Sequence, residues 1–177
     1  MPDILKDINI SEQFSILAIT PIIKLQERIN NVIKKFSESG LSGIYVSFSK
    51  PYETLKNIFS QNSINIEKIF FIDCISKSTE GREKKNNVFY ISNAGDLDDL
   101  GISITEILEN NKIDFLLIDS LETLLIYNKI NTVAIFTQSL VRKSIKFKLK
   151  TIILTSDSDK KLADEIAMFF DKIIEAS

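Results

Sequence analysis

The chain has 177 residues, 44% of them hydrophobic, with 22 Lys and Arg against 24 Asp and Glu and a formal net charge of −2. This length and apolar content are typical of one domain with a sizeable core, and the small net charge gives no whole-chain signal for nucleic acid or a membrane surface. Histidine is absent and cysteine occurs once, at Cys74, which excludes Ser-His-Asp and Cys-His catalysis, the usual zinc sites and an internal disulfide framework.

Short apolar runs alternate along the chain with amphipathic segments. The runs predict strands at Phe14–Ile19, Ile44–Phe48, Ile69–Asp73, Val88–Ile91, Phe115–Asp119, Thr151–Thr155 and Lys172–Ile174. The segments between them predict helices at Ile23–Ser39, Tyr52–Gln61, Leu97–Asn111, Asn131–Phe147 and Lys160–Phe169. Strand–helix alternation of this kind predicts a three-layer α/β domain, with a mostly parallel central sheet and helices on both faces. We expect residues 1–177 to form one domain, with a core from about residue 14 to 176.

Helix borders carry recognisable end signals. Gly40 suits a positive φ after the first helix, and Pro51 suits the first turn of the second. Asp96 is the expected N-cap of the third predicted helix, and Asp157 or Ser158 that of the last. The polar segment at residues 76–87 is expected to be a loop that interrupts a pair of strands.

Open α/β sheets bind ligands beyond the carboxyl ends of their strands. The first predicted strand delivers Thr20 there, with Lys24 one helical turn later, and the fifth delivers Asp119 and Ser120. Asp119 has two interpretations that the sequence leaves open: a metal ligand, or a cap of the following turn with help from Ser120. Lys24 is either a phosphate-binding cation or a solvated residue in the first turn of a helix.

Several segments carry a family resemblance, and their order matters more than any one motif. They read GIYVSFSKPYETL at residues 43–55, EKIFFIDCIS at 67–76, IDFLLIDSLETLL at 113–125, KTIILTSD at 150–157 and DKIIEA at 171–176. This order resembles the RecA-like ATPase domains of the KaiC and RadA type, especially archaeal KaiC-like proteins. The resemblance covers Phe14–Ala176 and implies a RecA-like fold, with Asp119-Ser120 as the acid-hydroxyl pair on the Mg²⁺ side.

The chain departs from that family where the family binds phosphate. A glycine-rich Walker A loop, followed by Lys and Ser or Thr, would stand after the first strand, but no glycine precedes Gly40. Pro21 removes a backbone donor, the following Ile22 and Ile23 are β-branched, and Leu25 replaces the Mg²⁺-binding hydroxyl. Ser49-Lys50 stands where the family places a water-activating Glu.

The resemblance and its departures together predict a non-catalytic RecA/KaiC-like domain. Its expected role is regulation or assembly through contacts with another protein or with copies of itself, with no catalytic residue and no cofactor. An alternative hypothesis is a nucleotide-binding protein in which Thr20, Lys24, Asp119 and Ser120 hold ATP, with Asp119 on Mg²⁺. A further alternative is a receiver-like or flavodoxin-like binding module, although receiver domains place paired acids where this chain has Ile19-Thr20-Pro21.

The remaining features concern partners and location. Five cations occur in the nine residues Arg142–Lys150, but charge runs are usually solvated faces, and nucleic acid is not an expected partner. The start, MPDILKDINI, lacks the pattern of a signal peptide, and no apolar stretch approaches the roughly 20 residues needed to span a bilayer. We therefore expect a cytoplasmic protein that makes no membrane contact.

Overall fold

The computed structural model describes residues 4–6, 8–76 and 83–175. Within this part, eight strands are present: β1 (Phe14–Thr20), β2 (Gly43–Ser47), β3 (Ile69–Asp73), β4 (Glu83–Lys85), β5 (Val88–Tyr90), β6 (Phe115–Asp119), β7 (Lys150–Ser156) and β8 (Lys172–Glu175). Helices are α1 (Leu25–Glu38), α2 (Tyr52–Gln61), α3 (Leu97–Asn110), α4 (Ile130–Lys146) and α5 (Lys160–Ile166), with 3₁₀ turns η1 (Ile22–Lys24), η2 (Leu121–Ile126) and η3 (Ala167–Phe169).

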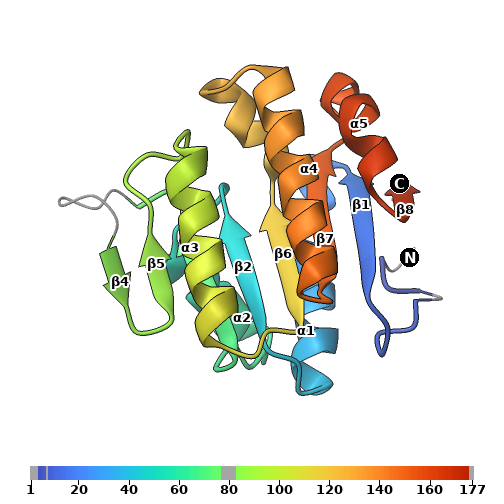
Figure 1. The fold of residues 1–177 in the computed structure, drawn as a ribbon. Helices are drawn as coiled ribbons and strands as arrows, with labels where there is room; N and C mark the ends of the chain where they lie inside the picture. Colours follow the sequence, from blue (N-terminus) through green and yellow to red (C-terminus); the bar gives the residue numbers. More distant parts are fainter. Residues whose placement is uncertain (1–3, 7, 77–82, 176–177) are drawn as a thin grey trace.

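All these strands form a single sheet in the order β4-β5-β3-β2-β6-β7-β1-β8, which is parallel except for the antiparallel β4–β5 pair (Figure 1). The central strands β2, β6 and β7 are buried along their whole length, as their continuous apolar sequences predict. The three-layer α/β prediction is therefore confirmed, and the predicted strands all occur with shifts of at most one residue at either end.

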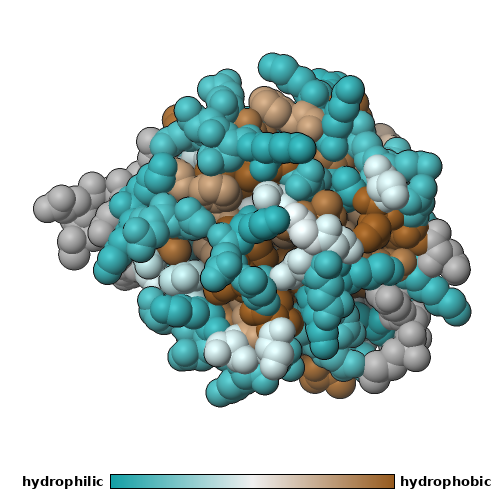
Figure 2. Space-filling model, turned by 90° about the horizontal axis from the view of Figure 1, so that it is seen from below, coloured by the Kyte–Doolittle hydropathy of each residue, from teal (hydrophilic) through white to brown (hydrophobic). Residues whose placement is uncertain are grey.

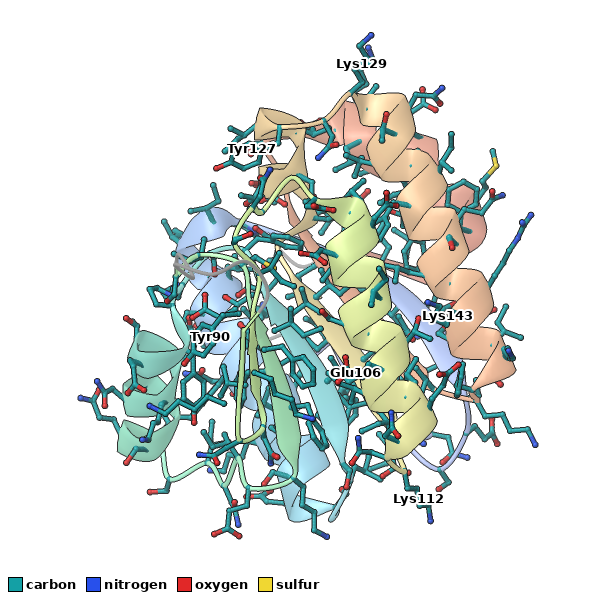
Figure 3. The ribbon with its side chains drawn as sticks, turned by 60° about the vertical axis from the view of Figure 1, so that its left-hand side comes forward. Tyr90, Glu106, Lys112, Tyr127, Lys129 and Lys143 are labelled. Carbon is teal, nitrogen blue, oxygen red and sulfur yellow. The ribbon has the colours of Figure 1, made fainter. Side chains whose placement is uncertain are left out.

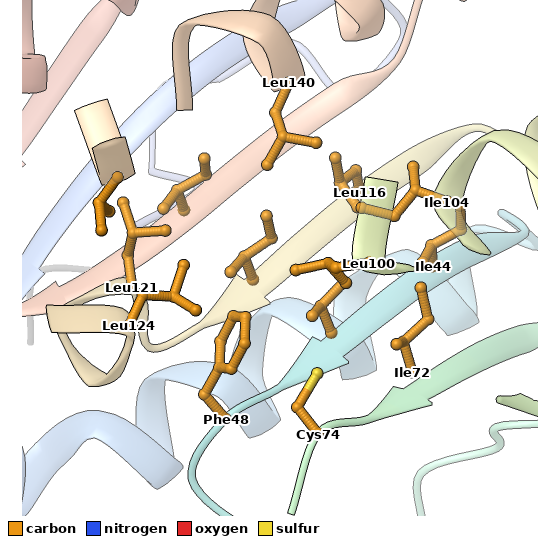
Figure 4. Packing of buried hydrophobic residues seen from close by; sticks show 14 of the residues in the cluster. Ile44, Phe48, Ile72, Cys74, Leu100, Ile104, Leu116, Leu121, Leu124 and Leu140 are labelled. Atoms are coloured by element: carbon orange, nitrogen blue, oxygen red, sulfur yellow. The ribbon is translucent and has the colours of Figure 1, made fainter. Parts of the chain in front are cut away.

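Two apolar cores lie on the two faces of the sheet. One contains Phe36 of α1, which packs against Phe115 of β6, and Phe59 of α2, which packs against Tyr45 of β2. The other contains residues of α3, α4 and α5 packed on the opposite face, with Leu100, Ile104 and Leu140 over the strands (Figure 4). The main hydrophobic stripe of each helix sequence determines which side meets the sheet.

The structure differs from the sequence predictions at several borders. The crossover from β3 to β5 contains β4, which the polar loop prediction missed, while residues 77–82 of that loop lie outside the described part. The last helix is capped by Asp159, whose side chain accepts from Leu162 N, so the prediction of Asp157 or Ser158 is wrong. Asp96 caps α3 as predicted, through Asp99 N, and Gly40 has a φ of 73°.

None of the helices in the described part of the chain combines the length and apolar composition that crossing a bilayer requires.

Candidate functional site

Parallel strands bring their carboxyl ends to one edge of the sheet, at the top of Figure 1. Side chains alternate between the two faces of a strand, so residues two positions apart share a face. The last residue on the α1–α2 face is polar in five strands: Thr20, Ser47, Asp73, Asp119 and Ser156. All five are buried. We call this group of strand ends the carboxyl rim.

Asp119 is the most deeply placed acid of the rim and is fully buried. Its Oδ2 accepts from the Tyr45 hydroxyl at 2.5 Å and from Ser49 Oγ at 2.7 Å. Burial raises the pKa of Asp119, although the hydrogen bonds from Tyr45 and Ser49 and the charge of Lys50 act in the opposite direction. Burial also raises the pKa of Tyr45, with the Asp119 charge adding to the effect. Protein hydroxyls therefore bind one oxygen of this carboxylate.

The other oxygen, Asp119 Oδ1, is buried and has no hydrogen-bond partner among the described residues. Both donors to Asp119 are side-chain hydroxyls, so the interpretation of its carboxylate as a backbone cap of the following turn is wrong. Ser120 is buried, follows Asp119 through a cis peptide bond and begins η2 without a side-chain capping bond. The predicted assistance of Ser120 in capping is therefore wrong as well.

The connection from β1 to α1 is short and contains no glycine. Pro21 is followed by the single turn η1, in which Lys24 N donates to Pro21 O at 2.9 Å and Leu25 N donates to Ile22 O. Those two N–H groups are used within the turn itself. Thr20 Oγ1 is buried and, within the described residues, has no hydrogen-bond partner, while Lys24 is half-buried at the start of α1.

The predicted site residues thus lie on one rim, on two strand ends that β7 separates. The sheet order β6-β7-β1 places Thr20 and Asp119 on the same face with Ser156 between them. A separation of two strands corresponds to about 10 Å between their backbones. Lys24 and Ser120 follow Thr20 and Asp119 on their separate segments. The space between Thr20 and Asp119 therefore spans the end of β7.

Glu122 is a rim residue that the sequence analysis missed. It lies on η2, and its carboxylate accepts from Thr155 Oγ1 at 3.1 Å and from Ser156 N at 3.2 Å. Its charge also acts to raise the pKa of Asp119. The sequence signal for this role was its position: Glu122 stands three residues after Asp119, in the turn that follows β6 and lies beside β7.

Asp73 has a structural role. Its carboxylate accepts from Tyr52 N at the first residue of α2, from Ile75 N, and from both the N and Oγ of Ser76. These four donors satisfy both oxygens and fix the start of α2. Within the described residues no cluster of three or more His, Cys, Asp or Glu side chains is arranged to hold a metal ion.

Comparison with known proteins gives the same architecture. No curated protein sequence matches the chain. The fold is similar to the crystal structure of the KaiC-like protein PH0186 from the hyperthermophilic archaeon Pyrococcus horikoshii OT3, with a TM-score of 0.73 and 16% sequence identity, over 93% of this chain and 72% of that one. The family model described as ATPase: KaiC matches residues 29–174, a range that begins inside α1 and leaves out the β1–α1 connection. Since this match covers most of its length, the chain belongs to the KaiC ATPase family.

Proposed function

We propose that this chain is a KaiC-like domain that has lost ATP hydrolysis and acts as a cytoplasmic regulatory or assembly protein through contacts with another protein chain. The observation that carries the proposal is the β1–α1 connection. A phosphate loop offers successive free N–H groups to the phosphates, and glycines allow it to do so. Here Pro21 has no N–H, and the N–H groups of Lys24 and Leu25 are bonded within η1.

The same connection exposes apolar side chains. Ile22 is 62% and Ile23 89% exposed, at the place where a member of the family with a phosphate loop would hold an anion. Further exposed apolar residues follow the carboxyl ends of other strands, at Ile75 after β3 and at Ile126 and Tyr127 after β6. The opposite face of the molecule, which Figure 2 shows from below, is mostly hydrophilic. Exposed apolar side chains at these strand ends favour a protein partner there over a phosphate.

The chemistry at Asp119 supports the loss of hydrolysis. Oδ2 is bound to Tyr45 and Ser49, and Ser49-Lys50 follows β2 where the family resemblance leads us to expect an acid that activates water. A lysine side chain does not supply the carboxylate that such an acid would provide. The orientation of Asp119 is therefore maintained by protein contacts, without a nucleotide.

A second candidate function is nucleotide binding without hydrolysis, at an atypical site. The specific observation in its favour is that two of the four buried side-chain oxygens without a hydrogen-bond partner among the described residues, Thr20 Oγ1 and Asp119 Oδ1, lie on the carboxyl rim. Buried polar atoms normally have partners, and a ligand long enough to span the end of β7, or separate waters at the two oxygens, would supply them. In this hypothesis Lys24 neutralises a phosphate, and Asp119 with Ser120 meets Mg²⁺.

Calorimetric titration with ATP and with ADP, with and without Mg²⁺, separates the two functions. The proposal of lost nucleotide chemistry predicts no heat at millimolar nucleotide for the wild type. Micromolar binding that is lost in Lys24→Ala would instead establish the atypical site. Measurable ATP turnover that Asp119→Asn abolishes would overturn the non-catalytic proposal.

A further inference from the structure

Helices α3 and α4 lie side by side on the face of the sheet away from α1 and α2, and a groove runs between them (Figure 3). The groove has a volume of about 730 Å³, and its lining includes Gly101, Ile102, Phe136 and Lys143. Lys143 crosses it from α4 to bond Thr105 Oγ1 on α3. No other helix covers this pair in Figure 1, so its outer surface is open.

Each helix presents a stripe of exposed residues that points away from the sheet. On α3 the stripe is Asp98, Ile102 and Glu109, and on α4 it is Ile135, Arg142 and Lys146. The spacings of 4, 7 and 11 residues place the members of each stripe on one side of a helix. Ile102 is 55% and Ile135 62% exposed, so each stripe has one large apolar side chain in water.

The two helices have opposite charge. The α3 sequence contains four acids and no Lys or Arg, while α4 contains Arg142, Lys143 and Lys146 and no Asp or Glu. Some of these charged side chains have partners within the molecule: Glu106 pairs with Lys84 at 3.9 Å, Lys143 bonds Thr105, and Lys146 Nζ lies over the Phe147 ring, 5.5 Å from its centroid. The exposed acids Asp98 and Glu109 on the α3 stripe thus lie beside the exposed bases Arg142 and Lys146 on the α4 stripe.

We propose that this α3–α4 face binds a second copy of the chain, related by a two-fold axis that runs parallel to the two helices. Both helices follow parallel strands and run in the same direction (Figure 1). Rotation about such an axis keeps that direction and lays the acidic α3 of each copy on the basic α4 of the other, twice. A two-fold contact must be complementary to itself, and one acidic and one basic helix side by side fulfil that condition.

The heights of the residues along the helices agree with this pairing. Lys143 bonds Thr105, so these two residues lie at about the same height along the helix axes. Glu109, one turn after Thr105, therefore lies near the height of Arg142 and Lys146 at the carboxyl-terminal end of α4. In the dimer, Glu109 therefore faces Arg142 and Lys146 of the partner subunit. Ile102 lies three residues, about 4.5 Å, before Thr105, and so meets the stretch of the partner's α4 between Ile135 and Arg142.

The groove also has room at Gly101. A Cβ built on this residue meets no atom within 4 Å, so the surface of α3 is hollowed beside Ile102. An apolar side chain from the second copy would fill this hollow without displacing anything. Two helices about 21 and 26 Å long offer a small face, so the dimer is expected to dissociate in the micromolar range and to weaken as salt screens its charges.

This inference stands apart from the proposed function, because the α3–α4 stripes and the carboxyl rim use different residues. Its test is sedimentation velocity of the full chain from low micromolar to submillimolar concentration, in low salt. We expect the wild type to shift from monomer to dimer. The acid-reversed variant Asp98→Lys/Glu109→Lys and the base-reversed variant Arg142→Glu/Lys146→Glu should each raise the dimer dissociation constant at least ~10-fold.

The decisive sample is an equimolar mixture of these two variants. Every α3–α4 contact between them again joins opposite charges, so a mixed dimer of near wild-type affinity should form. The matched controls are Asp164→Lys/Glu165→Lys and Lys160→Glu/Lys161→Glu, equal charge reversals at exposed positions of α5, which should leave the dimer intact. A monomeric wild type, a dimer insensitive to both reversals, a mixture without recovery, or loss of the dimer in the α5 controls would overturn the proposal.

Discussion

The hydroxyl of Tyr45 donates to Asp119 Oδ2 across the β2–β6 pair, with 2.5 Å between the two oxygens. Tyr45 is itself fixed, because its ring packs against Phe59 and Phe71 at centroid distances of 6.1 and 5.6 Å. The acid that the family resemblance assigns to Mg²⁺ is thus attached to the aromatic core of the α1–α2 face. The Asp119 carboxylate therefore contributes to the packing of the core as well as to the chemistry of the carboxyl rim.

Replacing Tyr45 by Phe keeps the ring packing and removes the donor. Asp119 Oδ2 then keeps only Ser49, and a buried acceptor that loses its partner costs about 1–3 kcal/mol. We expect the free energy of unfolding to fall by that amount, as measured by urea denaturation with an unchanged m-value. Tyr127→Phe, at an exposed tyrosine, is the control and should change stability by less than about 0.5 kcal/mol. Equal effects of the two substitutions would contradict the assigned contact.

A second prediction concerns pH. Burial raises the pKa of Asp119 in the folded chain above the value of about 3.9 for Asp in an unfolded chain. Between these two values the folded state holds a proton that the unfolded state has released, so stability falls as pH rises. The contribution of Asp119 to the free energy of unfolding is fully present below about pH 3.9 and is lost as pH rises through the pKa of Asp119 in the folded chain.

Asp119→Asn removes that titration while keeping the shape of the side chain. We expect the stability of the variant relative to wild type to increase from pH 4 towards pH 7, as measured by urea unfolding at a series of pH values. Asp114→Asn is the control, at the acid that immediately precedes β6 at the other end of the strand. A flat difference for Asp119→Asn would mean that its folded pKa is not raised.

Much of the fold could be predicted because strands that are buried on both faces of the sheet have continuous apolar sequences. Continuous apolar runs such as Phe115–Asp119 identified the central strands, and the 3.6-residue pattern identified the helices. β4 was missed because its sequence, Glu83, Lys84 and Lys85, carries no apolar pattern. Charged edge strands of this kind are common, since they resist further pairing.

The site was less predictable, because it depends on contacts between distant segments. The sequence placed Thr20 and Asp119 at strand ends correctly, but it gave no indication that Tyr45, 74 residues earlier in the chain, would bond Asp119. Nor could it show that Glu122 would reach Thr155 and Ser156 across the neighbouring strand. Such pairings follow from sheet order and register, which local patterns do not encode.

The third prediction is that the one thiol is inert in the folded chain. Cys74 is 5% exposed, and its pKa is raised by burial and, to a lesser degree, by the Asp73 charge. Since the thiolate is the reactive form, a disulfide reagent should modify Cys74 only through unfolding, at a rate that increases with urea. Ile75→Cys in a Cys74→Ala background places a thiol at an exposed neighbour and should react without denaturant. Rapid reaction of native Cys74 would contradict its burial.

The last prediction compares two glycines. A Cβ on Gly43, in β2, would lie 2.1–2.3 Å from ring atoms of Phe115, and that ring packs against Phe36 at 4.7 Å. Gly43→Ala should therefore destabilise the chain by about 1–3 kcal/mol through overpacking.

Gly101 is the control for Gly43, because it lies inside α3 and a Cβ there would meet no atom within 4 Å. Gly101→Ala should stabilise by roughly 0.5–1 kcal/mol, since alanine lowers the entropy cost of a helix interior. Thermal and urea unfolding measure both changes. In a Phe115→Leu background the ring that opposes the new methyl group is gone, so Gly43→Ala should cost less there than in the wild type. An unchanged cost would place the strain in the β2 backbone instead of in the contact between Gly43 and Phe115.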